Sequence, residues 1–357
     1  MKPMDMQSNI QKTDLLSLLP EDIILQITEM GYPEYRGEQL VNWLARGVRD
    51  FSEMQNLPKK MREDLSEHFT LFRPQVMRKQ ESKINGTVKF LWQLADGNSI
   101  ETVVMSYRYG NTVCISSQVG CRQGCAFCAS TIGGLVRNLT AGEMLDEVLF
   151  SEIESAKKIN HIVLMGIGEP LDNFNSVVQF LKLVNHKKGM NIGYRHISLS
   201  TCGITERFHD LALLDIPITL SVSLHAPDDE TRDRIMPANH GRGINELMKA
   251  CNEYFQMTGR RISFEYAMIR GVNDSEKHAE LLAQRAKEVG AHVNLIPLNH
   301  VDERNLTATS DRVIHAFKDK LEEEHVNVTI RRKLGSDIEA SCGQLRRNTI
   351  RETHSQS

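Results

Sequence analysis

The spacing of apolar residues changes along the chain, and the first pattern is that of amphipathic helices. Up to about residue 72, apolar residues recur three and four positions apart, as in "EDIILQITEMG" and "RGEQLVNWLARG". This spacing places them on one face of a helix, and the glycine that ends each stretch suits a helix C-cap. We therefore expect residues 1–72 to form a small helical module.

A strand-like pattern replaces the helical one over residues 73–106. In "GTVKFLWQLADGNSIETVVMSY", apolar residues alternate with other residues on both sides of Asp96-Gly97. Alternation predicts strands, and an Asp-Gly pair favours a tight hairpin turn. The segment is therefore expected to form a β-hairpin.

From residue 107 to 345, short apolar runs are separated by segments long enough to be helices. The runs are "TVCISS", "HIVLMG", "HISLST", "ITLSVSLHA", "ISFEYAMI", "HVNLIPL" and "VNVTIRR". Several are apolar at consecutive positions, as expected for a parallel sheet with both faces covered. We predict an α/β fold, specifically an incomplete α/β barrel, whose reacting groups lie at the carboxyl ends of the strands. Residues 346–357 are polar and are expected to be a frayed tail.

Composition and charge place the chain among ordinary globular proteins. It is 40% apolar and 25% charged, and its net charge of −3 gives no general support for nucleic-acid binding. No apolar run approaches the ~20 residues of a membrane-spanning helix, and the N-terminus lacks a signal peptide, so we expect a cytoplasmic protein. Three short basic clusters are more typical of solvated surface: Lys59, Lys60 and Arg62; Arg331, Arg332 and Lys333; and Arg346, Arg347 and Arg351.

Four of the seven cysteines lie in "CISSQVGCRQGCAFCAS". In a reducing compartment clustered cysteines are more often metal ligands or redox-active thiols than disulfides. Cys121, Cys125 and Cys128 form a C-x3-C-x2-C pattern in a tight loop, with Gly120 and Gly124 relieving the backbone. Structural zinc takes four ligands, and no fourth Cys or His stands at ligand spacing, whereas three cysteines on a four-iron cluster leave one iron open. The pattern favours iron–sulfur, with a zinc-containing RNA-binding protein as the alternative.

This triplet, placed after the first barrel strand, resembles the radical S-adenosylmethionine (SAM) superfamily. The stretches "SSQVGC", "RNLTAGE", "MGIGEP", "LSVSLHAP", "GVND", "HVNLIP" and "GSDIEASCGQL" together resemble the RlmN-type RNA adenine carbon-2 methyltransferases. The resemblance implies a partial (β/α)6-type radical SAM barrel with an N-terminal helical accessory domain and a hairpin extension. It also implies a 4Fe-4S cluster on the three cysteines and two SAM molecules per turnover. Carbon-8 methylation, as in the related Cfr type, and a radical SAM enzyme of another reaction class remain alternatives.

The same resemblance assigns the SAM contacts, which are Gly168, Glu169, Ser200, Ser223, Leu224, His225 and Asn299. In "MGIGEP", glycines allow a close approach of backbone to ligand, and Glu169 can accept hydrogen bonds from an ammonium. Thr140 and Glu143 are explained structurally, as a helix capping box. Cys202 and Cys251 match no functional position, and we expect them to be structural.

The catalytic residues implied by the resemblance are Cys342, Cys114 and Glu101. Because the target carbon is too electron-poor to attack SAM directly, Cys342 receives a methyl group from one SAM. The 5′-deoxyadenosyl radical from a second SAM removes a hydrogen atom from it, and the product adds to adenine. Cys114 then attacks the Cys342 sulfur, which releases the methylated base and leaves a transient disulfide. Glu101, in sequence an exposed carboxylate on a hairpin strand, matches the family's proton acceptor, with Cys114 as competing base.

The resemblance also implies the partners. These are 23S rRNA and tRNA as substrates and a flavodoxin or ferredoxin as reductant, with the enzyme acting as a monomer. An adenine in structured RNA must be unstacked to reach the pocket, which requires phosphate contacts around the site. The N-terminal helical module and the cluster Arg331, Arg332 and Lys333 are the candidates for these contacts.

Overall fold

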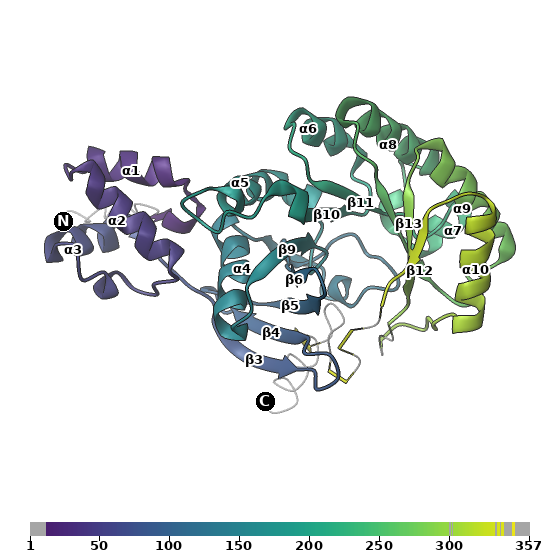
Figure 1. Ribbon diagram of the computed structural model, residues 1–357, viewed down its shortest axis with the longest axis horizontal. Helices are drawn as coiled ribbons and strands as arrows, with labels where there is room; N and C mark the ends of the chain where they lie inside the picture. The colour runs from purple at the N-terminus through teal and green to yellow at the C-terminus, as the bar shows by residue number, and fades with distance from the viewer. Residues whose placement is uncertain are drawn as a thin grey trace, which may run out of the picture.

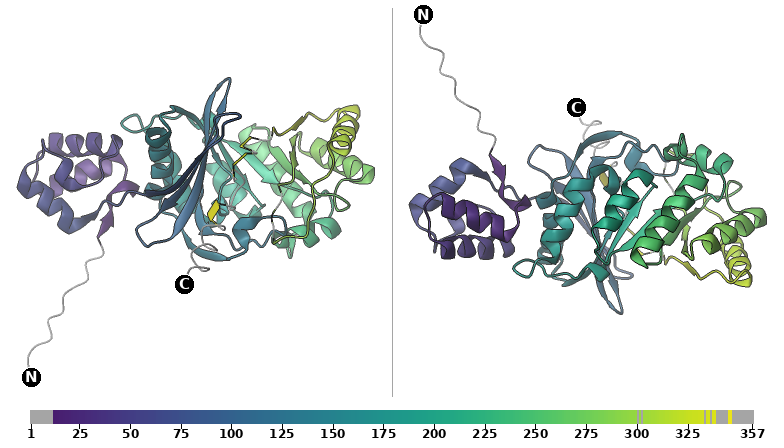
Figure 2. Two further views of the ribbon diagram at one scale, coloured as in Figure 1. Left: turned by 90° about the horizontal axis from the view of Figure 1, so that it is seen from below. Right: turned by 90° about the horizontal axis from the view of Figure 1, so that it is seen from above.

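The computed structural model describes residues 12–299, 301, 303–332, 334–335, 337–338 and 345–346. Its N-terminal elements form a compact unit at one end of the molecule (Figures 1 and 2). They are β1 (Thr13–Asp14), η1 (Leu15–Ser17), α1 (Pro20–Glu29), α2 (Glu34–Ala45), η2 (Phe51–Glu53), α3 (Lys59–His68) and β2 (Phe69–Thr70). The two predicted helices are confirmed, and both glycines beyond their ends, Gly31 and Gly47, have positive φ of 86° and 79°. The unit has its own apolar core, which includes Ile27, Leu40 and Leu65.

A ten-stranded sheet forms most of the remaining framework, and β7 (Gln118–Gly120) and β8 (Leu135–Asn138) form a separate two-stranded sheet. The predicted hairpin is confirmed: β4 (Val88–Gln93) and β5 (Ser99–Tyr107) pair antiparallel, and β3 (Gln75–Glu81) continues the sheet beside β4. β5 also pairs antiparallel with β6 (Gly110–Cys114), which joins the hairpin directly to the parallel strands. The hairpin strands are therefore an extension of the core sheet.

All seven strands predicted for the barrel are present, and they pair in parallel in chain order. They are β6, β9 (Ile159–Leu164), β10 (Ile197–Thr201), β11 (Thr219–Ser223), β12 (Ser263–Met268), β13 (His292–Pro297) and β14 (Val328–Ile330). β14 and β3 form the two edges of the sheet, so the barrel is incomplete, as predicted.

Helices connect consecutive parallel strands and cover one face of the sheet (Figure 1). They are α4 (Ala141–Ser155), α5 (Phe174–Asn185), α6 (Phe208–Leu213), α7 (Asp229–Ile235), α8 (Ile244–Thr258), α9 (Glu276–Glu288) and α10 (Asp311–Glu323). The expected capping box opens α4: the Thr140 hydroxyl accepts from the Glu143 N–H at 3.1 Å, and the Glu143 carboxylate accepts from the Thr140 N–H at 2.9 Å. Within the described residues, none of the helices has the length and apolar character of a membrane-spanning segment.

The inner face of the barrel is polar, which differs from the expectation of strands covered by apolar contacts on both sides. Along β10, Ile197 and Leu199 belong to the apolar core, whereas Ser198 and Ser200, which alternate with them, are only partly buried. Glu265 occupies such an inner position on β12. Apolar runs hid this alternation because small serine side chains interrupt them with little change in overall hydropathy.

Arg73 joins the N-terminal unit to the barrel. Its guanidinium is almost fully buried. It donates to the carbonyl oxygen of Leu44, in the last turn of α2, at 2.8 Å and to that of Val48, just beyond α2, at 3.0 Å. It also forms a buried ion pair with Asp146 of α4. One side chain therefore ties the end of a helix in one unit to a helix of the other.

We expect Arg73→Met to destabilise the protein by about 3–5 kcal/mol, because the buried Asp146 loses its only ion-pair partner among the described residues. The double variant Arg73→Met/Asp146→Leu removes the charge as well and should recover much of that loss. Chemical unfolding of both variants at pH 8 measures the difference. Equal destabilisation in the two variants would contradict the assigned role of the buried charge.

Candidate active site

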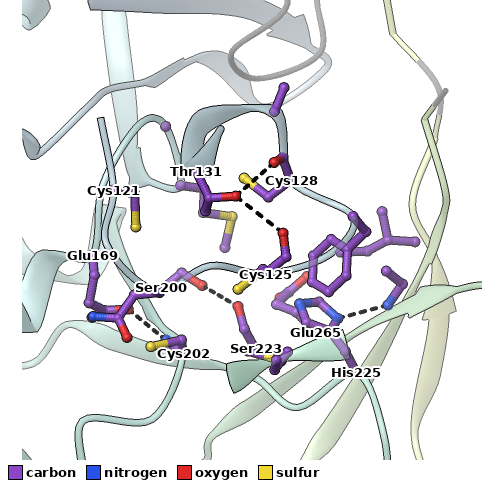
Figure 3. A pocket seen from close by; sticks show the side chains of 18 of the residues that line it. Cys121, Cys125, Cys128, Thr131, Glu169, Ser200, Cys202, Ser223, His225 and Glu265 are labelled. Atoms are coloured by element: carbon purple, nitrogen blue, oxygen red, sulfur yellow. Dashed lines mark hydrogen bonds between the residues drawn. The ribbon is translucent and has the colours of Figure 1, made fainter. Parts of the chain in front are cut away.

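A cavity of about 270 Å³ opens at the carboxyl ends of the parallel strands. It brings together residues from the loop after β7 and from the ends of β9 to β13, and Figure 3 shows their side chains directed into it. Those predicted from the sequence are Cys121, Cys125, Cys128, Gly168, Glu169, Ser200, Ser223, His225 and Asn299. Residues separated by up to 178 positions in the chain thus share one site because the parallel strands end at the same rim.

The three cysteines lie in a loop between β7 (Gln118–Gly120) and η3 (Ala129–Thr131). The Thr131 hydroxyl donates to the carbonyl oxygens of Cys125 and Cys128 at 3.2 and 3.0 Å, which closes the loop (Figure 3). As expected, Gly120 and Gly124 have positive φ of 78° and 73°. The Ala126 N–H donates to the Ile235 carbonyl at 2.8 Å, which fixes the loop to the end of α7.

Burial raises the pKa of all three thiols, that of Cys121 to about 12. Without a metal they are therefore protonated at neutral pH, and bound iron would displace these protons and neutralise the thiolates. No set of three His, Cys, Asp or Glu side chains among the described residues converges on a point suited to one metal ion. A four-iron cluster instead gives each cysteine its own iron, so this donor set fits such a cluster.

The glycines of "MGIGEP" line the cavity and also have a packing role that the sequence did not predict. A Cβ atom on Gly166 would lie 2.5 Å from the Ile115 carbonyl oxygen. Gly168 has φ of +111°, and its Cβ would lie 2.7 Å from Ser117 Oγ and Gln118 Cβ. Both glycines therefore allow the end of β9 to cross closely over the chain that leads into the cysteine loop.

Glu169 is buried, and both of its carboxylate oxygens accept backbone hydrogen bonds. Oε1 accepts from the Leu171 N–H at 3.0 Å, and Oε2 accepts from the Cys202 N–H at 2.7 Å. Burial raises the pKa of this carboxyl, and the two backbone donors oppose that rise. Each oxygen keeps acceptor capacity, so Glu169 can receive a ligand ammonium at the cavity wall.

His225 lines the cavity in an uncommon backbone conformation, with φ of 55°. Its Nδ1 accepts from the Ala267 N–H at 2.9 Å, which leaves the proton on Nε2, and its ring packs edge-on against Phe127 at 4.7 Å. Burial, helped by Arg232, lowers the pKa of His225 to about 3. The imidazole is therefore neutral under physiological conditions.

Of the remaining predicted SAM contacts, Ser200, Ser223 and Asn299 line the cavity and Leu224 does not. Ser200 and Ser223 lie across the cavity floor with their hydroxyl oxygens 3.4 Å apart, and Asn299 is exposed just beyond β13. Leu224 has a fully buried side chain in the barrel core, outside the cavity lining. Its N–H and carbonyl are also engaged, with the Glu265 carbonyl at 3.1 Å and Arg232 Nε at 3.1 Å.

Arg232 is a buried arginine for which the sequence predicted no role. Besides Leu224, its guanidinium donates to the carbonyls of Cys202 at 2.7 Å and Ser223 at 3.3 Å, and to the Asn239 side chain at 2.6 Å. These contacts join the ends of β10 and β11 beneath the cavity. Because charged donors form stronger hydrogen bonds than neutral ones, Arg232 is a firm support for this wall.

Glu265 and Arg331 also line the cavity, although the sequence did not predict either of them there. Glu265 is buried, burial raises its pKa, and its Oε2 accepts from Asn294 Nδ2 at 2.8 Å. Arg331 lines the cavity, although the sequence analysis grouped it with a surface cluster for RNA. A charged residue inside an apolar strand, as in "ISFEYAMI", was the available signal for Glu265.

Glu101 is buried, not exposed as expected from the sequence. Its Oε2 lies 2.9 Å from Nζ of the fully buried Lys89, and its Oε1 accepts from the Arg346 N–H at 2.5 Å. Cys114 lies on the neighbouring strand, opposite Val103. Glu101, Val103 and Cys114 share one face of the sheet because alternate residues of a strand point to the same side.

The other cysteines and the basic clusters singled out in the sequence lie partly in the core, partly at the surface and partly outside the described residues. Cys251 is fully buried in the core, as expected, whereas Cys202 also lines the cavity. Cys342 lies outside the described residues, as do Lys333, Arg347 and Arg351. Lys59 is exposed on α3, 3.7 Å from Glu63.

Comparison with known proteins extends over nearly the whole chain. A family model described as the radical SAM superfamily matches residues 115–282, and one described as the ribosomal RNA large subunit methyltransferase N-terminal domain matches residues 13–71. A protein of Desulforamulus reducens named "Probable dual-specificity RNA methyltransferase RlmN" is 48% identical over 342 residues, which cover 96% of this chain and 98% of that protein. A protein of the same name from Alkaliphilus oremlandii is 48% identical over 341 residues, which cover 96% of this chain and 99% of that protein.

A solved structure shares the complete architecture. The crystal structure of a radical SAM methyltransferase from Sphaerobacter thermophilus matches with a TM-score of 0.88 at 38% identity. The match covers 93% of this chain and 98% of that one. The likeness therefore includes both the N-terminal unit and the barrel.

The depressed pKa of His225 predicts a loss of stability in mild acid. The folded-state pKa of His225 is about 3, below the ordinary ~6.5. As pH falls below 6.5, His225 therefore becomes protonated in the unfolded chain but stays neutral in the folded protein. This contributes about 1.4 kcal/mol of destabilisation at pH 5.5 relative to pH 8. His225→Asn keeps an acceptor near Nδ1 and tolerates positive φ, and it should lose this contribution in urea unfolding at both pH values. An unchanged pH dependence in the variant would contradict the assignment.

Proposed function

The chain belongs to the RlmN family of radical SAM RNA methyltransferases, and from this premise we propose that it methylates carbon 2 of a specific adenine in 23S rRNA and in tRNA. The observation that carries the proposal is the convergence of three thiols, Glu169 and the Ser200–Ser223 pair on one cavity. The radical SAM chemistry of the family uses a 4Fe-4S cluster and SAM. Membership of an enzyme family excludes the alternative of a non-catalytic zinc protein.

Cys121, Cys125 and Cys128 would hold the cluster, and the opposite wall would hold SAM. Glu169 would accept from its ammonium, the Ser200 and Ser223 hydroxyls offer hydrogen bonds to its polar groups, and neutral His225 adds an aromatic wall. When bound and reduced, the cluster and SAM supply a 5′-deoxyadenosyl radical. Arg232 would keep the SAM wall in place through its backbone contacts with Cys202 and Ser223.

Cys342 would act as the carbon carrier. Its sulfur accepts a methyl group, the S-methyl group loses one hydrogen atom, and the resulting methylene bonds to carbon 2 of adenine. Loss of the carbon-2 proton and of one electron would then restore the aromatic ring, and the 4Fe-4S cluster, which is oxidised once SAM has been cleaved, would accept that electron. In this relay the electron-poor carbon 2 does not have to act as a nucleophile toward SAM.

Glu101 is the better candidate for the group that takes the carbon-2 proton. Burial raises the pKa of the competing Cys114 to about 11, so its sulfur carries a proton at neutral pH and is unable to accept another. The Glu101 carboxylate is held in place by Lys89, whose Nζ lies 2.9 Å from Oε2. It would accept the proton on the sheet face that it shares with Cys114.

Cys114 would complete the reaction by attack on the Cys342 sulfur. The new sulfur–sulfur bond forms as the bond from sulfur to the methylene carbon breaks, and that carbon takes up a proton to become the methyl group. Because the attacking species is a thiolate, the high pKa of Cys114 requires that its proton be removed first. The disulfide is then reduced before the next turnover.

The wider setting follows from the family. Dual specificity in the names of the relatives supports both rRNA and tRNA as substrates, with a flavodoxin or ferredoxin as electron donor. We propose a monomer that acts in the cytoplasm. The N-terminal unit, which carries the basic residues Lys59 and Lys60 on α3, would contact the RNA around the target adenine.

Removal of each cysteine of the pair should stop the reaction at a different point. Cys342→Ala should abolish methylation and leave no covalent RNA adduct, because the carbon carrier is absent. Cys114→Ala should accumulate a protein–RNA adduct, because the adduct is no longer resolved. Denaturing gel electrophoresis with labelled RNA measures the adduct, and Cys251→Ala, at a buried cysteine outside the cavity lining, is the control. Equal adduct levels in the two variants would contradict the proposed order.

A further inference from the structure

A second cavity lies on the sheet face that carries Glu101 and Cys114. It has a volume of about 180 Å³ and is formed between the carboxyl end of β5 and the amino-terminal parts of β6, β9 and β10. Met105 and Tyr107 of β5 and Thr112 of β6 line it on one side, and His161 of β9 lines it on the other. The mechanism proposed above uses none of these residues.

The cavity has an aromatic wall with an exposed end. Tyr109, in the turn between β5 and β6, is 66% exposed and stacks on Tyr107 with ring centroids 5.0 Å apart and planes at 6°. The rings of His161 and Tyr109 are nearly perpendicular, with centroids 5.1 Å apart, and the rings of His161 and His196 have centroids 4.8 Å apart. Exposed aromatic rings in a groove are the surface on which single-stranded bases stack.

Basic and polar groups accompany these rings. Arg195 and Arg331 line the cavity, and no acidic side chain is among its lining residues in the described part of the chain. Thr112 is 95% buried, and its hydroxyl has no hydrogen-bond partner within the described structure. A buried hydroxyl without a partner is costly, so its position at a cavity points to a polar ligand.

This cavity lies next to the proposed methylation site. Thr112 precedes Cys114 by two residues on β6, which places it about 7 Å further along the same sheet face. Met105 and Tyr107 extend the same face of β5 beyond Glu101 and Val103. Arg331 lines both cavities, so the two are neighbours.

We propose that this second cavity is the subsite for an RNA nucleotide that flanks the target adenine. The base of that nucleotide stacks on Tyr109, the Thr112 hydroxyl bonds one of its polar atoms, and Arg195 contacts the adjoining phosphate. Stacking platforms and cationic groups together recognise single-stranded RNA, which is the form that an unstacked target requires. This inference rests on the proposed function, since it needs RNA as substrate.

The test is the affinity of the reconstituted full-length enzyme for a 23S rRNA fragment that contains the target adenine, measured by fluorescence anisotropy. Tyr109→Ala should weaken binding by about 5- to 150-fold, because one stacked base is lost, whereas Tyr109→Phe should bind like wild type. SAM cleavage without RNA should be unchanged in both variants. Wild-type affinity in Tyr109→Ala overturns the proposal.

The salt dependence of binding gives an independent measurement. Arg195→Ala should reduce the slope of log affinity against log salt by about one, because one phosphate contact is lost. Arg312→Ala is the matched control, since Arg312 is exposed on α10 and lies outside the cavity lining. If Tyr109→Ala fails to fold, an unchanged slope in Arg195→Ala overturns the proposal. Methyladenosine in RNA treated with the wild-type enzyme separates this failure from failure of the proposed function.

Discussion

The structure depends above all on the consecutive parallel pairing of seven strands, β6 and β9 to β14. Parallel strands present their carboxyl ends at one rim, so residues distant in the chain reach one cavity without a long loop. The alternation of each strand then divides its residues between a helix-covered apolar core and a polar interior. Ser200, Ser223 and Glu265 have their positions near the cysteine loop for this single reason.

Buried polar contacts give that rim its rigidity. Glu169 accepts from the Cys202 N–H, and Arg232 donates to the Cys202 carbonyl, so both sides of one peptide segment are held. The cysteine loop is fixed in turn to the end of α7 by the bond from the Ala126 N–H to the Ile235 carbonyl. A site prepared in this way requires little rearrangement to bind a cluster and SAM, which favours affinity and precise orientation.

The seven barrel strands and the lining residues Cys121, Cys125, Cys128, Glu169, Ser200 and Ser223 could be predicted from sequence, since apolar runs with polar ends are local signals. The burial of Glu101 could not, because one carboxylate on an alternating strand reveals neither the covering residues nor its partner Lys89. The packing role of Gly166 and Gly168 could not be predicted either, since close chain crossing is a tertiary property. Arg232 gave no signal at all, because its backbone acceptors come from strands that meet it only in the fold.

The central claim is the site of methylation, and the most direct measurement identifies the product. Reconstituted protein is incubated with SAM, a flavodoxin-type reductant and an unmethylated 23S rRNA fragment, and the digested RNA is compared with standards by mass spectrometry. The proposed function predicts the carbon-2 isomer of methyladenosine. The carbon-8 isomer would contradict that regiochemistry, and absence of any methyladenosine while SAM is cleaved would contradict the RNA substrate itself.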